Sequence, residues 1–303
     1  MVGKRTAKDY ILDGIIILTM VIVLVSILYP LLNALAISLN HADDTRLGGI
    51  TVWPRVWSFD SYSNILTNNM IWRAYGVTIA RTVIGTLGAL FFTGILAYGL
   101  AHSELVGRKY YAIFCLIPMY VVGGMIPTFL MIRAMGLFNS FWVFIIPNLI
   151  GLFNIILMRT FFQSIPESLE ESAKLDGANY LQIFFKIIIP VSTPIMATIA
   201  LFVGVGHWND WFFGNVYITD PSLRPMQNIL LGIINEARAD AAMAALVSEI
   251  GGAARLGSVG RNATNVRSIT MATMFVTIAP VVVIYPFLQR YFIKGMMVGS
   301  IKG

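Results

Sequence analysis

The chain has 303 residues, of which 57% are apolar and only 12% are charged, and its formal net charge is +6. A soluble domain carries about 25% charged residues, so this composition excludes an ordinary soluble enzyme or binding module and indicates an integral membrane protein. The single cysteine, Cys115, excludes a disulfide within the chain.

Six apolar segments are long enough to cross a bilayer of about 30 Å as helices. These segments are 11–32, 74–100, 111–132, 141–163, 191–214 and 269–292. Two long loops, 33–73 and 215–268, lie between them; the second is rich in alanine and glycine, and we expect a short helix in its first part. The predicted fold class is therefore all-α, with six transmembrane helices in a single membrane domain over residues 1–303.

The distribution of lysines predicts how the chain is oriented. Positive side chains collect in the short loops on the cytoplasmic side of a membrane. With the N-terminus inside, all lysines fall on that side: Lys4, Lys8, Lys109, Lys174, Lys186, Lys294 and Lys302. We therefore expect both termini and the segment 164–190 to be cytoplasmic, and the segments 33–73 and 215–268 to be external. This explains the positive charge better than a nucleic-acid partner does.

The segment 164–190 is strongly acidic although it lies between two apolar spans. Its carboxylates lie within ten residues of one another: Glu167, Glu170, Glu171 and Asp176. Charge at the bilayer centre costs ~2.5–3.5 kcal/mol per group, so the segment must lie outside the hydrocarbon. Ser164 and Glu167 have the spacing of a capping box, and Gly177 suits the left-handed residue that ends a helix. We predict a helix, a turn at Gly177 and a second amphipathic helix up to Pro190, which together form a docking element for a soluble partner.

No pattern in the chain provides a catalytic or metal site. The histidines His41, His102 and His207 are far apart, and nothing has the spacing of a zinc site or a nucleophile elbow. The phosphate-binding pattern G-x-x-x-x-G-K-[ST] does not occur. We therefore expect no enzyme activity and no cofactor in this chain, and any ATP that drives it must bind to another protein.

Part of the acidic segment resembles the EAA loop of bacterial ABC-importer permeases. The family pattern is E-A-A, three residues, G, nine residues and then I-x-L-P. Here Glu171-Ser172-Ala173, Gly177 and 187–190 match it, with Ser172 in place of the second alanine and Ile189 in place of leucine. The resemblance implies the type I ABC-importer permease fold, in which this loop is the coupling helix that lies in a groove of the ATPase. The residues to which it assigns coupling are Glu170, Glu171, Ser172, Ala173, Asp176, Gly177 and Pro190.

Other strings narrow the resemblance to one subgroup. The stretches 123–142, 206–212 and 285–303 are similar to the second permeases of maltose-type oligosaccharide importers, especially those for aldouronate, polygalacturonate and alginate. Membership implies alternating access in a bacterial inner membrane. It also implies a heterodimer with a sister permease, two ATPase subunits that bind ATP and Mg, and an extracytoplasmic binding protein, which the 215–268 loop would contact.

The residues on the substrate path are less clearly indicated. In GHWNDWF, the rings of Trp208, Trp211 and Phe212 offer flat faces to sugars and Asn209 offers an amide, but an aromatic belt at the membrane interface explains the same string. Asn148 and Asn154 are also candidates. Six residues turn a helix by about 600°, so at most one of these two needs to face the path. Arg81 and Asp13 lie near the ends of spans, where snorkelling or interface placement explains them.

Two alternatives to an acidic-oligosaccharide importer remain open. One is an importer permease for another solute, such as a neutral sugar or a peptide. The other is a secondary transporter that needs no ATPase, although ion coupling requires ionisable residues within the membrane and the spans hold few of them. The identity of the sugar, and whether this subunit or its sister holds the sugar site, are not decided by the sequence.

Overall fold

The structure is a computed structural model that describes residues 7–45, 47–121, 123–249 and 266–286. Within these ranges the regular elements are helical, apart from an isolated β-bridge between Asn40 and Trp57. The chain divides into two compact units, Met1–Asn69 with Leu230–Thr277 and Met70–Ile229 with Ile278–Gly303. We describe each unit by itself.

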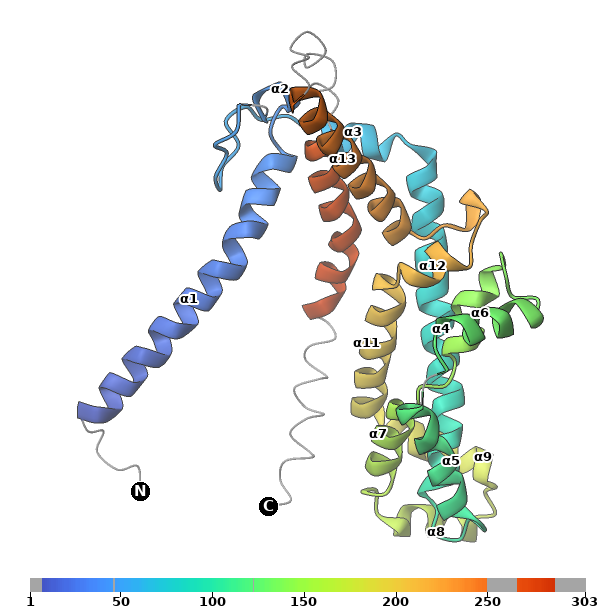
Figure 1. Ribbon diagram of the computed structural model, residues 1–303. Helices are drawn as coiled ribbons and strands as arrows, with labels where there is room; N and C mark the ends of the chain where they lie inside the picture. The colour runs from blue at the N-terminus through green and yellow to red at the C-terminus, as the bar shows by residue number, and fades with distance from the viewer. Residues whose placement is uncertain (1–6, 46, 122, 250–265, 287–303) are drawn as a thin grey trace. The chain divides into compact units, whose positions relative to one another are not determined.

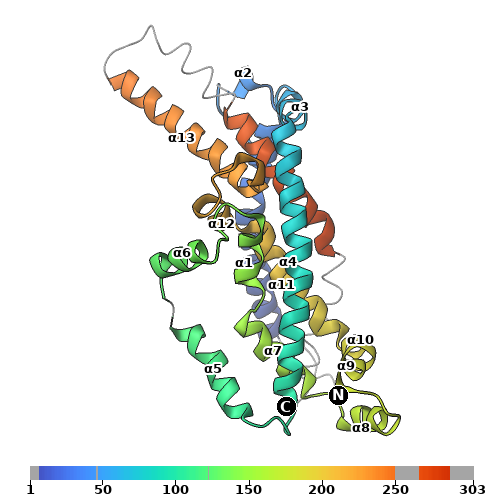
Figure 2. The same cartoon turned by 90° about the vertical axis from the view of Figure 1, so that its right-hand side faces the viewer.

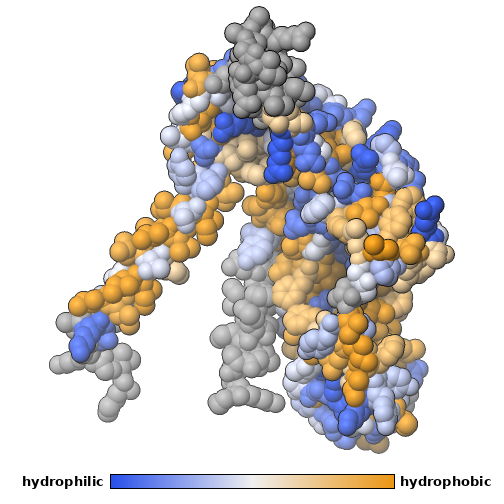
Figure 3. Space-filling model, in the orientation of Figure 1, coloured by the Kyte–Doolittle hydropathy of each residue, from blue (hydrophilic) through white to orange (hydrophobic). Residues whose placement is uncertain are grey.

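The first unit is dominated by one long apolar helix. Its helices are α1 (Ala7–Ser38), α2 (Ala42–Thr45), α3 (Asp60–Leu66), most of α13 (Met226–Glu249) and the first half of the helix Val266–Pro286. The most apolar stretch of α1 has no buried residue, and Figure 3 shows hydrophobic side chains along the length of this helix. A helix that is apolar all round needs lipid or another chain as its neighbour.

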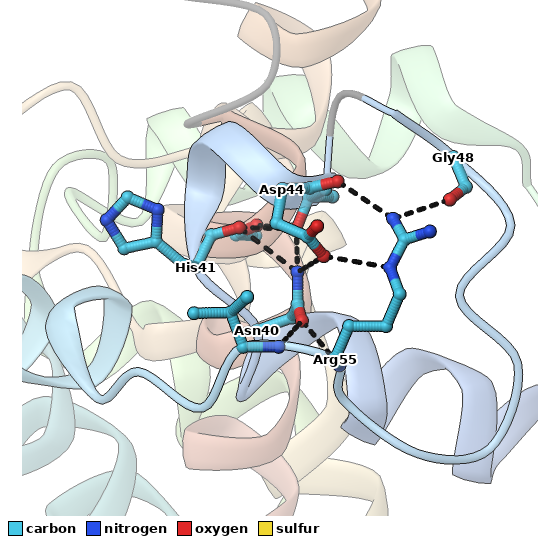
Figure 4. A network of polar contacts seen from close by, with 8 residues as sticks. Asn40, His41, Asp44, Gly48 and Arg55 are labelled. Atoms are coloured by element: carbon cyan, nitrogen blue, oxygen red, sulfur yellow. Dashed lines mark hydrogen bonds and ion pairs between the residues drawn. The ribbon is translucent and has the colours of Figure 1, made fainter.

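A network of hydrogen bonds holds the chain that follows α1 in a fixed loop (Figure 4). Asn40 is 1% exposed, and its side-chain carbonyl accepts hydrogen bonds from the backbone N–H groups of Arg55 and Val56, both at 2.9 Å. Its amide group donates to the Asp44 carboxylate at 2.9 Å, and Arg55 Nε donates to the same carboxylate at 3.0 Å. These two donors, Asn40 first, hold the pKa of Asp44 below its ordinary value of 3.8. The network is therefore fully present at neutral pH and weakens as the pH falls through the lowered pKa.

We predict that Asn40→Ala releases this loop. The substitution leaves the backbone N–H groups of Arg55 and Val56 without their acceptor and removes one of the two donors to Asp44, and buried groups without partners are costly. Trypsin cleavage after Arg55 should become roughly tenfold faster. Asn64→Ala, at an exposed position of α3, is the matched control. Equal cleavage rates in the two variants would contradict the role of the network.

The second unit packs its helices around two apolar cores (Figure 1). Its helices are α4 (Asn69–Ala101), α5 (Arg108–Tyr120), α6 (Met125–Ala134), α7 (Leu152–Phe162), α8 (Glu167–Leu175), α9 (Tyr180–Ile183), α10 (Ile189–Val191), α11 (Thr193–Asn209) and α12 (Phe212–Val216). Short 3₁₀ turns occupy Phe141–Phe144, Ile146–Asn148 and Pro221–Leu223. One core joins α4, α7, α8, α9 and α11, and the other joins α6, the 3₁₀ turns before α7 and the chain after α12.

The number of predicted spans agrees with the structure. The helices Lys8–Ser38, Asn69–Ala101 and Val266–Pro286 are long and apolar enough to cross a membrane, and three bent helix pairs raise the number to six if each pair is one span. These helices and pairs coincide with the six predicted segments, although residues 287–292 of the last one lie outside the described residues.

The prediction of continuous helices for three of these spans is wrong. The segment 141–163 is a pair of 3₁₀ turns and α7, bent by 47°, because Pro147 and Gly151 interrupt regular hydrogen bonding. The segment 191–214 breaks at Asp210, whose carboxylate accepts hydrogen bonds from the first N–H groups of α12. In 111–132, α5 and α6 are separated by a break that contains Gly124, which has a φ of +84°.

Both predicted outer loops contain more helix than expected. The segment 33–73 holds α2, α3 and the ends of α1 and α4. In 215–268 we expected a short helix, whereas α13 runs for 24 residues. The glycine-rich part that follows Ile250, and most of the string 285–303, lie outside the described residues.

Candidate functional site

The acidic segment forms two helices around a glycine turn, as predicted, and lies at the Ala101 end of α4 (Figure 2). Gly177 has a φ of +82°, its N–H donates to Lys174 O at 3.0 Å, and the N–H of Ala178 donates to Ala173 O at 2.9 Å. This pair of bonds is the Schellman motif, which requires a left-handed residue and therefore favours glycine. The turn at Gly177 is confirmed.

The predicted capping box is wrong in its position. The Ser164 hydroxyl donates to Phe161 O at 2.7 Å, and α8 begins after Pro166 without a side-chain cap. A capping box occurs at the start of α9 instead, where Asn179 and Gln182 each bond the other's backbone N–H, at 2.9 and 3.0 Å. The preceding proline already restricts the entry to α8, so a polar cap there is not needed.

The second helix continues through Pro190, as predicted, but it is not regular. A π-helical turn, Phe184–Ile188, lies between α9 and α10. Pro190 has no N–H to donate to the preceding turn, and a local change to π geometry accommodates a missing bond of this kind. Phe184 and Ile188 are buried in the core that also contains Tyr98 and Met158.

The two faces of α8 differ in chemistry. Ala173 is buried against the core of the same unit, so its small side chain lets α8 lie close to its own protein. Glu171, Ser172 and Asp176 are exposed, and Leu175 is 90% exposed at the tip. The helix is thus anchored on one side and presents carboxylates and an apolar tip on the other.

A polar cavity of about 460 Å³ lies beside α8. From α8 it is lined by Glu167, Glu170, Glu171 and Lys174, and from the chain after α4 by His102, Glu104 and Arg108. Within it, His102 Nε2 lies 2.8 Å from Glu170 Oε2. Glu170 is therefore directed towards its own protein, whereas the neighbouring Glu171 is exposed.

A second polar cluster lies within the apolar part of the unit, around Arg81. Snorkelling was the wrong explanation for this residue, because its side chain is 0% exposed. Its guanidinium lies 3.3 Å from the Asp210 carboxylate, donates to the Asp210 carbonyl, and lies 5.0 Å from the centre of the Phe144 ring. A charge in an apolar interior needs such a partner, and Asp210 lies at the break between α11 and α12, where it can reach Arg81.

A cavity of about 300 Å³ adjoins this ion pair. Its lining is Asn148, Val203, Gly206, His207, Asp210 and Phe213. His207 is 7% exposed, and its ring lies where a side chain on Gly85 would otherwise be. Two ionisable groups and an amide are therefore brought together at one hollow in an apolar unit.

The predicted path residues are not all at this cavity. Asn148 lines it, and its amide donates to Phe144 O at 3.1 Å. Asn154 packs against Gly151 instead. Trp208 is buried near Tyr75, Asn209 accepts a hydrogen bond from Gln227, Trp211 is exposed, and Phe212 packs against Tyr217.

Sequence reasoning missed Arg81, His207 and Asp210 as a group, and it missed His102. Arg81 carried a usable signal, since an ionisable residue seven positions inside the predicted span 74–100 requires a partner. His102 carried none, because its partner is 68 residues away. Among the described residues, no three His, Cys, Asp or Glu side chains come together in a way that could hold a metal ion.

Comparison with known proteins identifies the family. Residues 2–298 match the model of the binding-protein-dependent transport system inner membrane component. The chain belongs to this family. It is accordingly a multi-pass permease component of a transport system.

Relatives and a solved structure agree with this assignment. The permease is 38% identical over 274 residues to the polygalacturonan/rhamnogalacturonan transport system permease protein YtcP of Bacillus subtilis, covering 90% of this chain and 92% of that protein. It is 35% identical to the protein LplC of the same organism, over 90% of this chain and 89% of LplC. A chain in the crystal structure of a bacterial ABC transporter that imports the acidic polysaccharide alginate matches with a TM-score of 0.85 and 29% identity, over 96% of this permease and 99% of that chain.

We predict that the Arg81–Asp210 pair is essential for the stability of the permease. Asp210→Asn removes the charge opposite a fully buried guanidinium and should cost about 3 kcal/mol or more, because an unpaired buried charge is strongly unfavourable. The double variant Arg81→Met/Asp210→Asn should recover part of this loss, and Arg133→Met, at an exposed arginine, should have little effect. Thermal unfolding of the purified transporter measures all three. A double variant less stable than Asp210→Asn alone would contradict the pairing.

Proposed function

We propose that this permease is a subunit of an ATP-driven importer that carries acidic oligosaccharides across the bacterial inner membrane by alternating access. The observation that carries the proposal is the α8–Gly177–α9 element, which is anchored through Ala173 and exposes Glu171 and Leu175. This is the shape and chemistry of a short helix that docks into a groove of a soluble partner.

The proposed partners are two ATPase subunits, a sister permease and a binding protein. The chain has no phosphate-binding pattern, so two separate ATPase subunits would bind ATP and Mg. The uncovered apolar surface of α1 suits contact with a sister permease and lipid. A binding protein would deliver the sugar from outside, while α8 and both termini would face the cytoplasm, consistent with the lysine distribution.

Coupling requires that ATP binding favours one conformation of the permease over the other. A ligand shifts such an equilibrium only by its difference in affinity for the two states, and a shift from 1:99 to 99:1 requires about 5.5 kcal/mol. In this protein the bias would enter through α8, because Glu171 and Leu175 are among its exposed groups that an ATPase groove can reach.

The acidic class of sugar is supported by the named relatives. YtcP is described as a polygalacturonan/rhamnogalacturonan permease, and the structural relative imports the acidic polysaccharide alginate. A neutral oligosaccharide is the alternative that the experiment must exclude.

We expect Glu171→Arg to abolish transport. The complex of this permease, its sister, the ATPase and the binding protein would be reconstituted in vesicles, and ATP hydrolysis would be measured with uronate and neutral oligosaccharides. Uronates should stimulate hydrolysis severalfold, and the substitution should remove both this stimulation and the ATPase from the purified complex, because it reverses an exposed charge on α8. Stimulation by neutral sugars alone would overturn the substrate class, and an ATPase that never co-purifies would overturn the function.

The substrate path in this subunit runs, in our proposal, past the cavity of Asn148, His207 and Asp210. Its polar groups can bond sugar hydroxyls, and its apolar walls suit the faces of a sugar ring. Asp210 is already satisfied by Arg81 and by backbone N–H groups, so Asn148 and His207 remain available. Trp211 is exposed and so stays a candidate for contact, whereas Trp208, Asn209, Asn154 and Phe212 are engaged with the protein's own residues.

The two asparagines offer a matched test of this path. Asn148→Leu should lower the uptake rate at limiting sugar roughly fivefold, because it removes one hydrogen-bonding group from the cavity lining. Asn154→Leu makes the same chemical change outside the cavity and should leave uptake within twofold of the native rate. Equal effects of the two substitutions on sugar uptake would show that the cavity is not on the path.

A further inference from the structure

His102 lies between two hydrogen-bond acceptors. Its Nδ1 is 2.8 Å from the Tyr98 carbonyl oxygen, and its Nε2 is 2.8 Å from Glu170 Oε2. Neutral imidazole has one N–H, whereas imidazolium has two. An imidazolium ring can donate to the Tyr98 carbonyl and to the Glu170 carboxylate at the same time. The bond to an ionised Glu170 is then charge-assisted.

The same ring belongs to a set of side chains that close the end of α4. The last carbonyls of a helix have no partner within it and favour positive charge. Here the Tyr98 carbonyl faces His102, the Leu100 carbonyl accepts from Arg108 Nε at 3.1 Å, and the Ala101 carbonyl accepts from Gln163 at 3.4 Å. His102 also contacts Glu170 of α8.

The contact between His102 and Glu170 is shielded from solvent. The two side chains are 19% and 17% exposed, and the ring lies edge-on to Tyr98 at 4.5 Å and to Tyr180 at 5.7 Å between centroids. A shielded pair is screened by salt less than a surface pair. The ammonium group of Lys174 lies over the Tyr180 ring, 4.9 Å from its centre. His102 thus joins α4, α8 and α9.

We propose that His102 is a positioning residue that latches α8 to the end of α4, so that movement of α8 is transmitted to a helix that crosses the membrane. The inference rests on the proposed docking of the ATPase on α8. The two adjacent carboxylates then have different roles. The exposed Glu171 faces the partner, and Glu170 holds α8 to its own protein. Along α4, the latch lies about 32 Å from Arg81, at 1.5 Å per residue, so one helix connects it with the ion pair at the cavity.

The test is the number of ATP molecules hydrolysed per uronate oligosaccharide imported, in vesicles that contain the complete transporter and binding protein. His102→Gln and Glu170→Gln should each raise this ratio roughly five- to tenfold while the ATPase still co-purifies. The double variant should be no worse than either single one, because both remove the same bond. His102→Lys supplies a charged N–H donor to Glu170 and should restore most of the coupling. Arg133→Gln, at an exposed arginine of α6 outside the acidic element, is the control.

Several outcomes would overturn the latch. An unchanged ratio in both single variants would do so, as would losses that multiply in the double variant. Loss of the ATPase from Glu170→Gln but not from His102→Gln would mean that Glu170 contacts the partner directly.

A second measurement does not depend on transport. Amide hydrogen exchange in α8 of the purified chain should become roughly tenfold faster in His102→Gln and stay unchanged in Arg133→Gln. Failure of the native complex to hydrolyse ATP would defeat the proposed function, whereas unchanged exchange would defeat the latch alone.

Discussion

Backbone N–H and C=O groups that are removed from water must find partners inside the protein, and this constraint explains most of the polar side chains described here. Several helix ends in the second unit are closed by side chains that accept or donate these bonds. Asp210 closes the break between α11 and α12, and three side chains close the end of α4. Residues that serve this need are then available for a second contact, as Asp210 is to Arg81 and His102 is to Glu170.

The helix α4 connects the two polar sites of the unit. Its last turn contacts the acidic element, and its middle holds Arg81 beside the cavity of His207 and Asn148. Small residues allow the close packing that this requires: Gly85 leaves room for the His207 ring, and Gly94 lies beside Phe184. Because α4 contacts both sites, a movement of the acidic element can change the position of Arg81 at the cavity.

Sequence reasoning predicted the elements whose signals are local. The six spans follow from apolar length, and the turn at Gly177 follows from the positive φ that glycine tolerates. The bend in 141–163 could be expected from Pro147, and the π turn from Pro190, whereas the break in 191–214 depends on Asp210, whose contact with Arg81 no local pattern shows. The pairs Arg81–Asp210 and His102–Glu170 join residues 129 and 68 positions apart, and no local pattern connects such residues. The aromatic residues of 206–212 were predicted to contact sugar. In the structure Trp208 and Phe212 pack against the protein's own side chains, and His207 lines the cavity.

The lack of buried residues along the apolar stretch of α1 has a consequence for how the chain is made. Membrane helices form and insert as separate units before they associate, since each satisfies its own backbone hydrogen bonds. Because this stretch of α1 loses no core contact when it stands alone, it can enter the bilayer as soon as it leaves the ribosome. This span would then anchor the chain while the residues that form the two cores, which follow α1 in the sequence, are still being added.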